Sequence, residues 1–350
     1  MRIAQISPLT ESVPPKLYGG TERVVSYLTE ALVELGHDVT LFASGDSQTS
    51  AKLEAVWPQA LRLDPGIRDR FAPHMLMLEM VRRQADQFDV LHFHLDYYPF
   101  SLFNRQATPF ITTLHGRLDL DEQQPVFDAF EKTPVISISN SQRQPLPQAN
   151  WINTVYHGLP ETLYQPQPVE QKYLAFMGRI SPEKRVDTAI RIAQRCGMTI
   201  RIAAKVDSAD REYFDREIKP LMDLPHVEFI GEIADHQKAE FLSGAHALLF
   251  PIDWPEPFGL VMIEAMACGT PVVAFKRGSV PEVLEHGVTG FIVEDETAAV
   301  AAVNRLHVLS RAKVRECFEA NFTSKRMAQE YVRSYEAIIQ KQRPRLRVVE

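Results

Sequence analysis

The segment 253–275 reads DWPEPFGLVMIEAMACGTPVVAF and is almost wholly apolar. Pro257 suits the first position of a helix, and Gly269 suits the position just after the last one. The sequence therefore predicts a helix from Pro257 to about Cys268, apolar on every face and so buried. The β-branched run PVVAF that follows predicts a buried strand, which makes this segment part of a strand–helix–strand unit in an α/β sheet.

The same alternation of short strands and helices runs through the rest of the chain. Expected strands lie at 2–7, 38–44, 88–94, 110–115 and 135–139, and after a break at 173–178, 198–204, 226–231, 246–251, 271–275 and 290–293. Several of these strands are apolar at every position, which is typical of parallel strands covered on both faces. Helices are expected at 21–35, ending before Gly36, and at 74–87.

The break at 158–172 contains three prolines and no periodicity, so it is predicted to be a linker. The sequence thus predicts two doubly wound α/β domains, residues 1–160 and 161–325, and a C-terminal helix and tail, 326–350, that packs back toward the first domain. Ligands of such sheets bind beyond the carboxyl ends of the strands, so a cleft is expected between the two sets of strand ends.

Composition excludes several classes of partner. The 350 residues carry 38 basic and 45 acidic side chains, a net charge of −7, which gives no reason to expect nucleic-acid binding. The three cysteines lie far apart without a CxxC pair, so neither a zinc knuckle nor a disulfide framework is indicated. No signal-peptide core and no apolar run long enough to span a bilayer is present, so a cytoplasmic location is expected, with peripheral membrane contact left open.

Two glutamates mark the predicted helix as a candidate site. Glu256 lies at its mouth, where the amides of Phe258, Gly259 and Leu260 would be unpaired donors that suit an anion. Glu264 lies two turns further in, among apolar neighbours. A buried carboxylate needs a partner. An internal salt bridge and a polar ligand, such as a pair of vicinal hydroxyls, are about equally consistent with this spacing.

A second candidate is GRISPEKRVDTAIRIAQRCG (178–197), where a strand ends and its Ser-Pro pair is suited to begin a helix at 182. Arg179, Lys184 and Arg185 crowd the positive end of that helix, where cations are unfavourable. Such a local conflict indicates function, and two cations beside a strand end would bind a diphosphate. One of the three must face outward, and Arg185 is the candidate for a plain surface charge.

Two weaker candidates lie in the first half. The segment LYGGTERVVSYLTEAL (17–32) places two glycines before a Thr21 cap, but it matches neither dinucleotide nor P-loop motifs, and a simple tight turn is equally consistent. The histidines of the strand at 88–94, His92 and His94, precede Asp96 with the spacing of a metal comb, an alternative weakened by the lack of further ligands. His115 ends another strand, at a position suited to ligand contact.

These residues resemble a known family. GRISPEKRVDTAI (178–190), PEPFGLVMIEAMACGTPVVAF (255–275) and GSVPEVLEHGVTGFIV (278–293) are similar to the motifs of the retaining glycosyltransferases of family 4, over nearly the whole chain. The resemblance implies the GT-B fold, two Rossmann-like domains facing across a cleft. The chain departs from the family at His157-Gly158, where many members have Asn-Gly, and at Gly278-Ser279, where Gly-Gly is common.

The resemblance also implies roles for single residues on the donor side. Arg179 and Lys184 match the pair that neutralises the nucleotide diphosphate, and Glu264 matches the glutamate that binds the ribose. Glu256 matches the glutamate that contacts the transferred sugar. The backbone of 258–260, namely Phe258, Gly259 and Leu260, matches the segment that contacts the donor.

Further matches concern the base, the phosphate loop and the acceptor side. Glu232 and Ile233 match the region flanking the base, and Gly20 matches the loop that approaches the donor phosphate. His115 matches a histidine near the reacting sugar. His94 and Asp96 are candidates for contacts with the acceptor.

The implied activity is transfer of a hexose from a UDP-, GDP- or ADP-sugar to a hydroxyl of a saccharide, lipid-linked or small-molecule acceptor, with retention and without a metal. The catalytic residues would be Glu256, His115, Arg179 and Lys184. The alternatives are a GT-B epimerase or phosphorylase and a non-catalytic nucleotide-sugar-binding module. A dehydrogenase is disfavoured because the dinucleotide fingerprint is absent. The sugar, base, acceptor and oligomeric state are not specified by the sequence.

Overall fold

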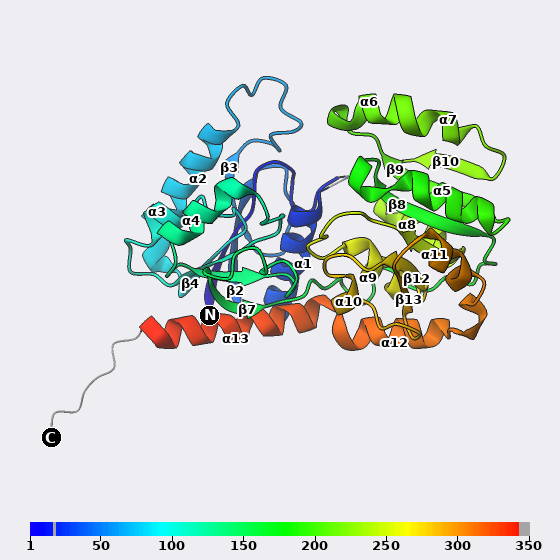
Figure 1. The fold of residues 1–350 in the computed structure, drawn as a ribbon. Helices are drawn as coiled ribbons and strands as arrows, with labels where there is room; N and C mark the ends of the chain where they lie inside the picture. The colour runs from blue at the N-terminus through cyan, green and yellow to red at the C-terminus, as the bar shows by residue number, and fades with distance from the viewer. Residues whose placement is uncertain (17–18, 343–350) are drawn as a thin grey trace. The chain divides into compact units, whose positions relative to one another are not determined.

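The computed structural model describes residues 1–16 and 19–342 (Figure 1). Residues 17–18, which begin the predicted Gly-Gly segment, and 343–350, which form the basic tail, lie outside the described residues. The chain divides into two compact units. Unit 1 comprises Met1–Gly158 and the stretch that begins at Ser324, and unit 2 comprises Leu159–Thr323.

Unit 1 is built on a parallel sheet. Its strands within the described ranges are β1 Arg2–Ile6, β2 Asp38–Ser44, β3 Lys52–Trp57, β4 Val90–Phe93, β5 Phe110–Thr113, β6 Pro134–Ser137 and β7 Asn150–Thr154. They are ordered β3-β2-β1-β4-β5-β6-β7, and every neighbouring pair is parallel. The order reverses between β1 and β4, which is where doubly wound sheets bind ligands.

The helices of unit 1 cover this sheet and include the last helix of the described chain. They are α1 Gly20–Glu34, α2 Phe71–Arg83, α3 Phe100–Phe103, α4 Gln124–Ala129 and α13 Ser324–Gln342. The helix α13, red in Figure 1, packs against α1. Its Tyr331 and Tyr335 are fully buried, so unit 1 takes part of its interior from a segment that follows all of unit 2 in sequence.

Unit 2 repeats the same plan. Its strands are β8 Tyr173–Arg179, β9 Ile200–Lys205, β10 Val227–Gly231, β11 Ala245–Phe250, β12 Val272–Phe275 and β13 Gly290–Val293. They form a parallel sheet in the order β10-β9-β8-β11-β12-β13, with the reversal between β8 and β11. The helices are α5 Val186–Arg195, α6 Arg211–Tyr213, α7 Lys219–Met222, α8 Asp235–Ser243, α9 Leu260–Ala267, α10 Val280–Val283, α11 Glu296–Val303 and α12 Arg311–Asn321.

The fold confirms two Rossmann-like α/β sheets, and the eleven expected strands all form, with ends shifted by one or two residues. Two strands of unit 1 are additional. β3 (KLEAVW) and β7 (NWINT) are the outermost strands of the sheet and are partly exposed, so their sequences carry polar residues and lack an apolar run. The expected helix at 74–87 is α2, which begins at Phe71, followed by a 3₁₀ turn at Ala85–Gln87.

None of the helices among the described residues combines the length and the hydropathy needed to cross a bilayer.

Candidate functional site

In unit 2 the predicted site residues gather at the point where the strand order reverses. β8 ends at Arg179 and β11 ends at Phe250, and the two strands are neighbours in the sheet. The segments that follow them, 180–185 and 251–259, carry Lys184 and Glu256, and the two segments are joined where Asp253 N donates to Glu183 O at 2.9 Å. Both segments therefore emerge at the carboxyl edge of the sheet, where ligands of this fold bind.

The helix after β11 begins later than the sequence predicts. α9 starts at Leu260, so the expected start at Pro257 is wrong. Gly259 precedes it with φ 79°, in the left-handed region, which a residue other than glycine rarely adopts and which separates the Pro257 turn from the helix. Leu260 therefore supplies a helix N-terminal amide, whereas Phe258 and Gly259 lie in the loop before it. Phe258 is buried there.

This loop is held by Gly278 and Ser279, the pair at which the chain departs from its family pattern. Ser279 N donates to Glu256 O at 3.0 Å, and Ser279 Oγ donates to Phe258 O at 2.8 Å. Gly278 has φ 53°, and a Cβ placed on it would lie 2.4 Å from both N and O of Glu256. The pair therefore fixes the backbone position of Glu256, and the serine hydroxyl satisfies a buried carbonyl.

We expect Gly278→Ala to displace the loop that carries Glu256. The added Cβ cannot be accommodated without moving the Glu256 backbone, so both the thermal midpoint and the turnover should fall. Gly287→Ala is the matched control, because Gly287 also has positive φ (81°) but a Cβ there would meet no heavy atom within 4 Å. That control should cost only the left-handed backbone strain, about 1 kcal/mol. Equal losses in unfolding free energy and turnover for the two variants would contradict the proposed contact.

Glu256 is buried and held by one of its two oxygens. Its Oε2 accepts hydrogen bonds from Lys184 Nζ and, at 3.0 Å, from Trp254 Nε1. The ammonium group of Lys184 also lies 5.0 Å from the ring centre of Trp254. Oε1 of Glu256 receives no hydrogen bond from the described residues and is not fully enclosed. One oxygen is thus anchored and the other is available to a ligand.

Glu264, within α9, shows the same arrangement. Its Oε1 accepts a 2.9 Å hydrogen bond from Lys238 Nζ of α8, and its Oε2 receives none within the described part of the chain. Lys238 Nζ lies 3.0 Å from Oδ1 of Asp235, and this oxygen also accepts a hydrogen bond from the Tyr164 hydroxyl. The internal salt bridge considered from the sequence is therefore present, and it leaves the second carboxylate oxygen without a partner among the described residues.

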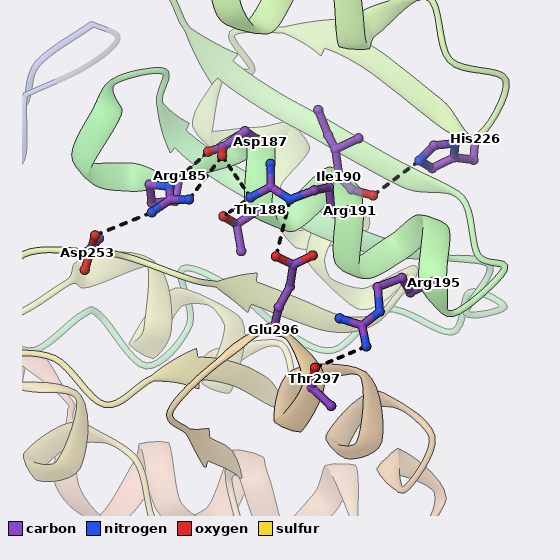
Figure 2. Close-up of polar contacts among 10 residues, drawn as sticks. All are labelled: Arg185, Asp187, Thr188, Ile190, Arg191, Arg195, His226, Asp253, Glu296 and Thr297. Atoms are coloured by element: carbon purple, nitrogen blue, oxygen red, sulfur yellow. Dashed lines mark hydrogen bonds and ion pairs between the residues drawn. The ribbon is translucent and has the colours of Figure 1, made fainter.

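The segment after β8 is not one continuous helix, so the expected helix beginning at residue 182 is wrong. A 3₁₀ turn at Pro182–Lys184 is followed by Arg185 at φ 55°, and α5 starts only at Val186. Arg185 pairs with Asp187 and Asp253 (Figure 2), a surface network that continues along α5. Arg185 is therefore paired with two acids, and its side chain is 33% exposed, so its role as a plain surface charge stays a prediction.

The remaining cation, Arg179, also has acidic partners. Its guanidinium group lies 2.6 Å from Glu183 and 3.5 Å from Asp210. The sequence predicts no local gain for these cations, but Arg179 and Arg185 pair with the nearby acids Glu183 and Asp187, and Lys184 pairs with the distant Glu256. Arg179 nonetheless keeps 35% of its side chain exposed, against 18% for Lys184, so both remain accessible to an anion.

Two further donor-side candidates lie at the ends of elements. Glu232 and Ile233 follow β10 and precede α8, and the Glu232 side chain is exposed. In unit 1, Gly20 is the first residue of α1 and Gly19 precedes the helix, so Thr21 is not the cap. A Cβ on Gly19 would lie 2.8 Å from Cβ of Pro15, so glycine is needed for this close approach.

Four histidines of unit 1, His92, His94, His115 and His157, form one cluster near the carboxyl ends of its strands. His94 Nδ1 lies 2.8 Å from His115 Nε2, and the ring of His115 stacks on that of His157 with centroids 5.3 Å apart. The rings of His92 and His94 are 4.1 Å apart. Burial lowers the pKa of His115 to about 3 and that of the other three well below 6.5, so all four are neutral near pH 7.

The geometry gives no support to a metal comb at this strand end. Both ring nitrogens of His92 and of His94 lie within hydrogen-bond distance of protein atoms, and Asp96 is exposed with φ 47°. No group of three or more histidine, cysteine, aspartate or glutamate side chains among the described residues could hold a metal ion.

Comparison with known proteins agrees with this architecture. The family model of glycosyl transferases group 1 matches residues 164–321, and that of glycosyltransferase family 4 matches residues 18–160. The chain belongs to glycosyltransferase family 4. A relative of this glycosyltransferase, the N-acetyl-alpha-D-glucosaminyl L-malate synthase of Bacillus anthracis, is 24% identical over 91% of this chain and 93% of its own length.

Solved structures confirm the GT-B fold of the family 4 glycosyltransferase. The sucrose-phosphate synthase of Thermosynechococcus elongatus has a TM-score of 0.80 at 21% identity, covering 97% of this chain and 99% of that one. The Anabaena protein HepE, solved in complex with UDP-glucose, has a TM-score of 0.74 at 19% identity, covering 96% of this chain and all of its own.

Several residues that shape the site of this glycosyltransferase are missed by sequence reasoning. Lys238 anchors Glu264, Ser279 fixes the Glu256 loop, and Gln5 contacts both His92 and His94. Only Gln5 carries a signal that could have been used, since it is a polar side chain inside the otherwise apolar strand β1 and is fully buried.

Proposed function

We propose that this glycosyltransferase transfers a hexose from a nucleoside diphosphate sugar to a hydroxyl acceptor, with retention of the anomeric configuration and without a metal ion. The observation that supports it is the pair of buried carboxylates on and before α9. In each, one oxygen is anchored by a lysine and the other has no partner among the described residues. Two such acceptors suit the hydroxyls of a ribose and of a sugar.

The cations at the end of β8 suit the leaving group. Negative charge grows on the diphosphate as its bond to the sugar breaks, so fixed positive groups nearby lower the barrier. Arg179 and Lys184 would exchange their acidic partners for the phosphates, assisted by the N-terminal amide of Leu260. Because these groups can meet the charge, the reaction would not require a divalent cation.

The other candidate residues are proposed to take the roles that the family resemblance implies. Glu264 would bind the ribose, Glu256 the transferred sugar, with the backbone of Phe258 and Gly259 adjoining it, and Glu232-Ile233 would flank the base. In unit 1, Gly20 would approach the donor phosphate and His115 would contact the reacting sugar. His94 and Asp96 are proposed to serve the acceptor side. Of these, His94 is buried and would act through His115.

The relatives support the donor class more than the acceptor. HepE has been solved with UDP-glucose, which favours a nucleotide sugar as donor here. The acceptor named in the Bacillus anthracis enzyme is L-malate, whereas sucrose-phosphate synthase makes a sugar phosphate, so relatives with this fold differ in what they glycosylate.

The test is a thermal-shift screen of UDP-, GDP- and ADP-sugars in the presence of EDTA, followed by turnover with the donor that binds. A donor at 100 times its dissociation constant should add about 2.7 kcal/mol of stability. Product of retained anomeric configuration, formed in EDTA, is expected. Failure of every donor to bind would overturn the proposal, turnover without an acceptor would indicate an epimerase, and binding without turnover toward any hydroxyl acceptor would indicate a binding module.

A further inference from the structure

A single chain of hydrogen bonds in unit 1 connects His115 with α13. Its members, in order, are His115, His94, Gln5, Tyr335, His92, Thr113 and Tyr331. Each neighbouring pair is joined over 2.7 to 3.0 Å. All members except His115 are at most 3% exposed, so water does not offer an alternative partner to their polar groups.

Gln5 gives this chain a direction. Its amide has one end that only accepts and one end that only donates. The acceptor Oε1 lies 2.9 Å from His94 Nε2, and the donor Nε2 lies 3.0 Å from the Tyr335 hydroxyl. With the Gln5 amide in this orientation, the proton of His94 is on Nε2.

The direction then passes to His115. A neutral imidazole carries one N–H, so Nδ1 of His94 is an acceptor and must receive the N–H of His115 Nε2, 2.8 Å away. Burial keeps both histidines neutral by lowering their pKa. His115 is thus left with an unprotonated Nδ1, which is buried and receives no hydrogen bond from any described residue.

We infer that Gln5 and His94 are positioning residues that fix His115 as a hydrogen-bond acceptor, so that its Nδ1 binds a hydroxyl group of the substrate. The inference rests on the proposed function, because the hydroxyl belongs to a sugar or to its acceptor. A buried acceptor without a donor is unfavourable, and a substrate hydroxyl satisfies it. The stacked ring of His157 keeps the imidazole plane, and hence the lone pair, in one orientation.

The chain has a second possible state, which makes the inference testable. If the Gln5 amide is turned by 180°, every hydrogen bond reverses, and His115 becomes a donor through Nδ1–H. In the acceptor state, Nδ1 of His115 binds only a substrate group that donates, such as a hydroxyl. In the donor state, Nδ1–H would also donate to an ether or carbonyl oxygen of the substrate. The tautomer of His115 thereby determines which substrate groups the enzyme can bind.

The first experiment needs no substrate. Two-bond ¹⁵N–¹H NMR spectra of the imidazoles in the ligand-free protein distinguish protonated from unprotonated ring nitrogens. We expect His115 and His94 in the Nε2–H form from pH 6 to 8. An Nδ1–H form of His115, or a charged ring, would overturn the inference without bearing on whether the protein is a glycosyltransferase.

The second experiment changes a residue that does not touch His115. Gln5→Met is similar in size and removes both ends of the amide, so both tautomers of His115 should become populated. Tyr331→Phe removes a hydroxyl at the far end of the same chain and is the control, which should leave His115 unchanged. His94→Asn, whose Oδ1 replaces the accepting Nδ1, should retain the wild-type tautomer. Unchanged spectra of His115 in folded Gln5→Met would contradict the role of Gln5.

The consequence for activity is measured with the donor chosen by the thermal-shift screen. Loss of one oriented hydrogen bond predicts a fall in kcat of roughly fivefold to tenfold in Gln5→Met. UDP affinity should stay unchanged, since Gln5 contacts none of the residues proposed to bind the nucleotide. A tautomer change without any fall in kcat would show that His115 does not contact a reacting group. If Gln5→Met does not fold, the wild-type tautomer and His94→Asn still decide the inference.

Discussion

Glu256→Gln should lower turnover by about 10²–10³-fold while the same variant binds nucleoside diphosphate more tightly than the wild type. The loss of turnover follows from removing a charged group proposed to contact the transferred sugar. The gain in affinity follows from the structure: Glu256 holds Lys184, so an incoming diphosphate must displace a carboxylate. Calorimetric titration with UDP, GDP and ADP, together with kcat, measures both effects.

Glu264→Gln is the matched comparison, because its carboxylate is equally buried and equally bound to a lysine. It should weaken the nucleotide by about 1–3 kcal/mol, since an amide is a poorer acceptor for hydroxyl groups. The two variants thus differ in the sign of their effect on nucleotide affinity. Equal weakening in both would contradict the assignment of Glu264 to the nucleotide and Glu256 to the sugar.

Unit 1 should lose stability as the pH falls below about 6.5. His92, His94, His115 and His157 have pKa values lowered by burial, to about 3 for His115, while the unfolded chain titrates near 6.5. Below pH 6.5 the unfolded state therefore binds more protons, and the free energy of unfolding falls. Each histidine that stays neutral in the folded state adds to this loss, so the free energy of unfolding is expected to decrease steadily from pH 6.5 to pH 5.

Amide hydrogen exchange of β4 at pH 8, 7, 6 and 5, corrected for intrinsic rates, reports this change within unit 1 itself. His157→Asn introduces the residue that many members of the family carry at this position. It should reduce the slope of the unfolding free energy against pH by the contribution of about one histidine. An unfolding free energy of unit 1 that stays constant between pH 7 and 5 would show that the cluster titrates normally.

The sequence specifies the sheets well because most strands of both units are buried and therefore apolar, and the exposed edge strand β10 still carries the apolar residues Phe229 and Ile230. It does not specify β3 and β7, whose position at the sheet edges removes that signal. The start of α9 was misplaced because a proline favours a helix start, whereas the left-handed Gly259 delays the helix by three residues. A Cβ at this position would lie 2.9 Å from Cε of Met262 and 3.2 Å from the ring of Phe250, a crowding that the local sequence does not reveal.

Sequence motifs identify the candidate residues, but they do not show which of them form ion pairs. Lys184 and Glu256 are 72 residues apart, and Lys238 and Glu264 are 26 apart, so local patterns carry no information about either ion pair. The sequence raised the choice between a salt bridge and a ligand for Glu264. The geometry shows the salt bridge at one oxygen, and no described residue donates to the other, so ligand binding stays a proposal for that second oxygen.

The position of α13 has a consequence for how the protein is made. Unit 2 is contiguous, Leu159–Thr323, whereas unit 1 contains a helix that is translated after it. On the ribosome, domains fold largely as they emerge. The N-terminal half must therefore wait, with His92 and Thr113 lacking Tyr335 and Tyr331, until the last helix has been released, and only then can the chain that orients His115 form. Formation of this polar chain is thus coupled to synthesis of α13, and a protein shortened before residue 331 would lack it.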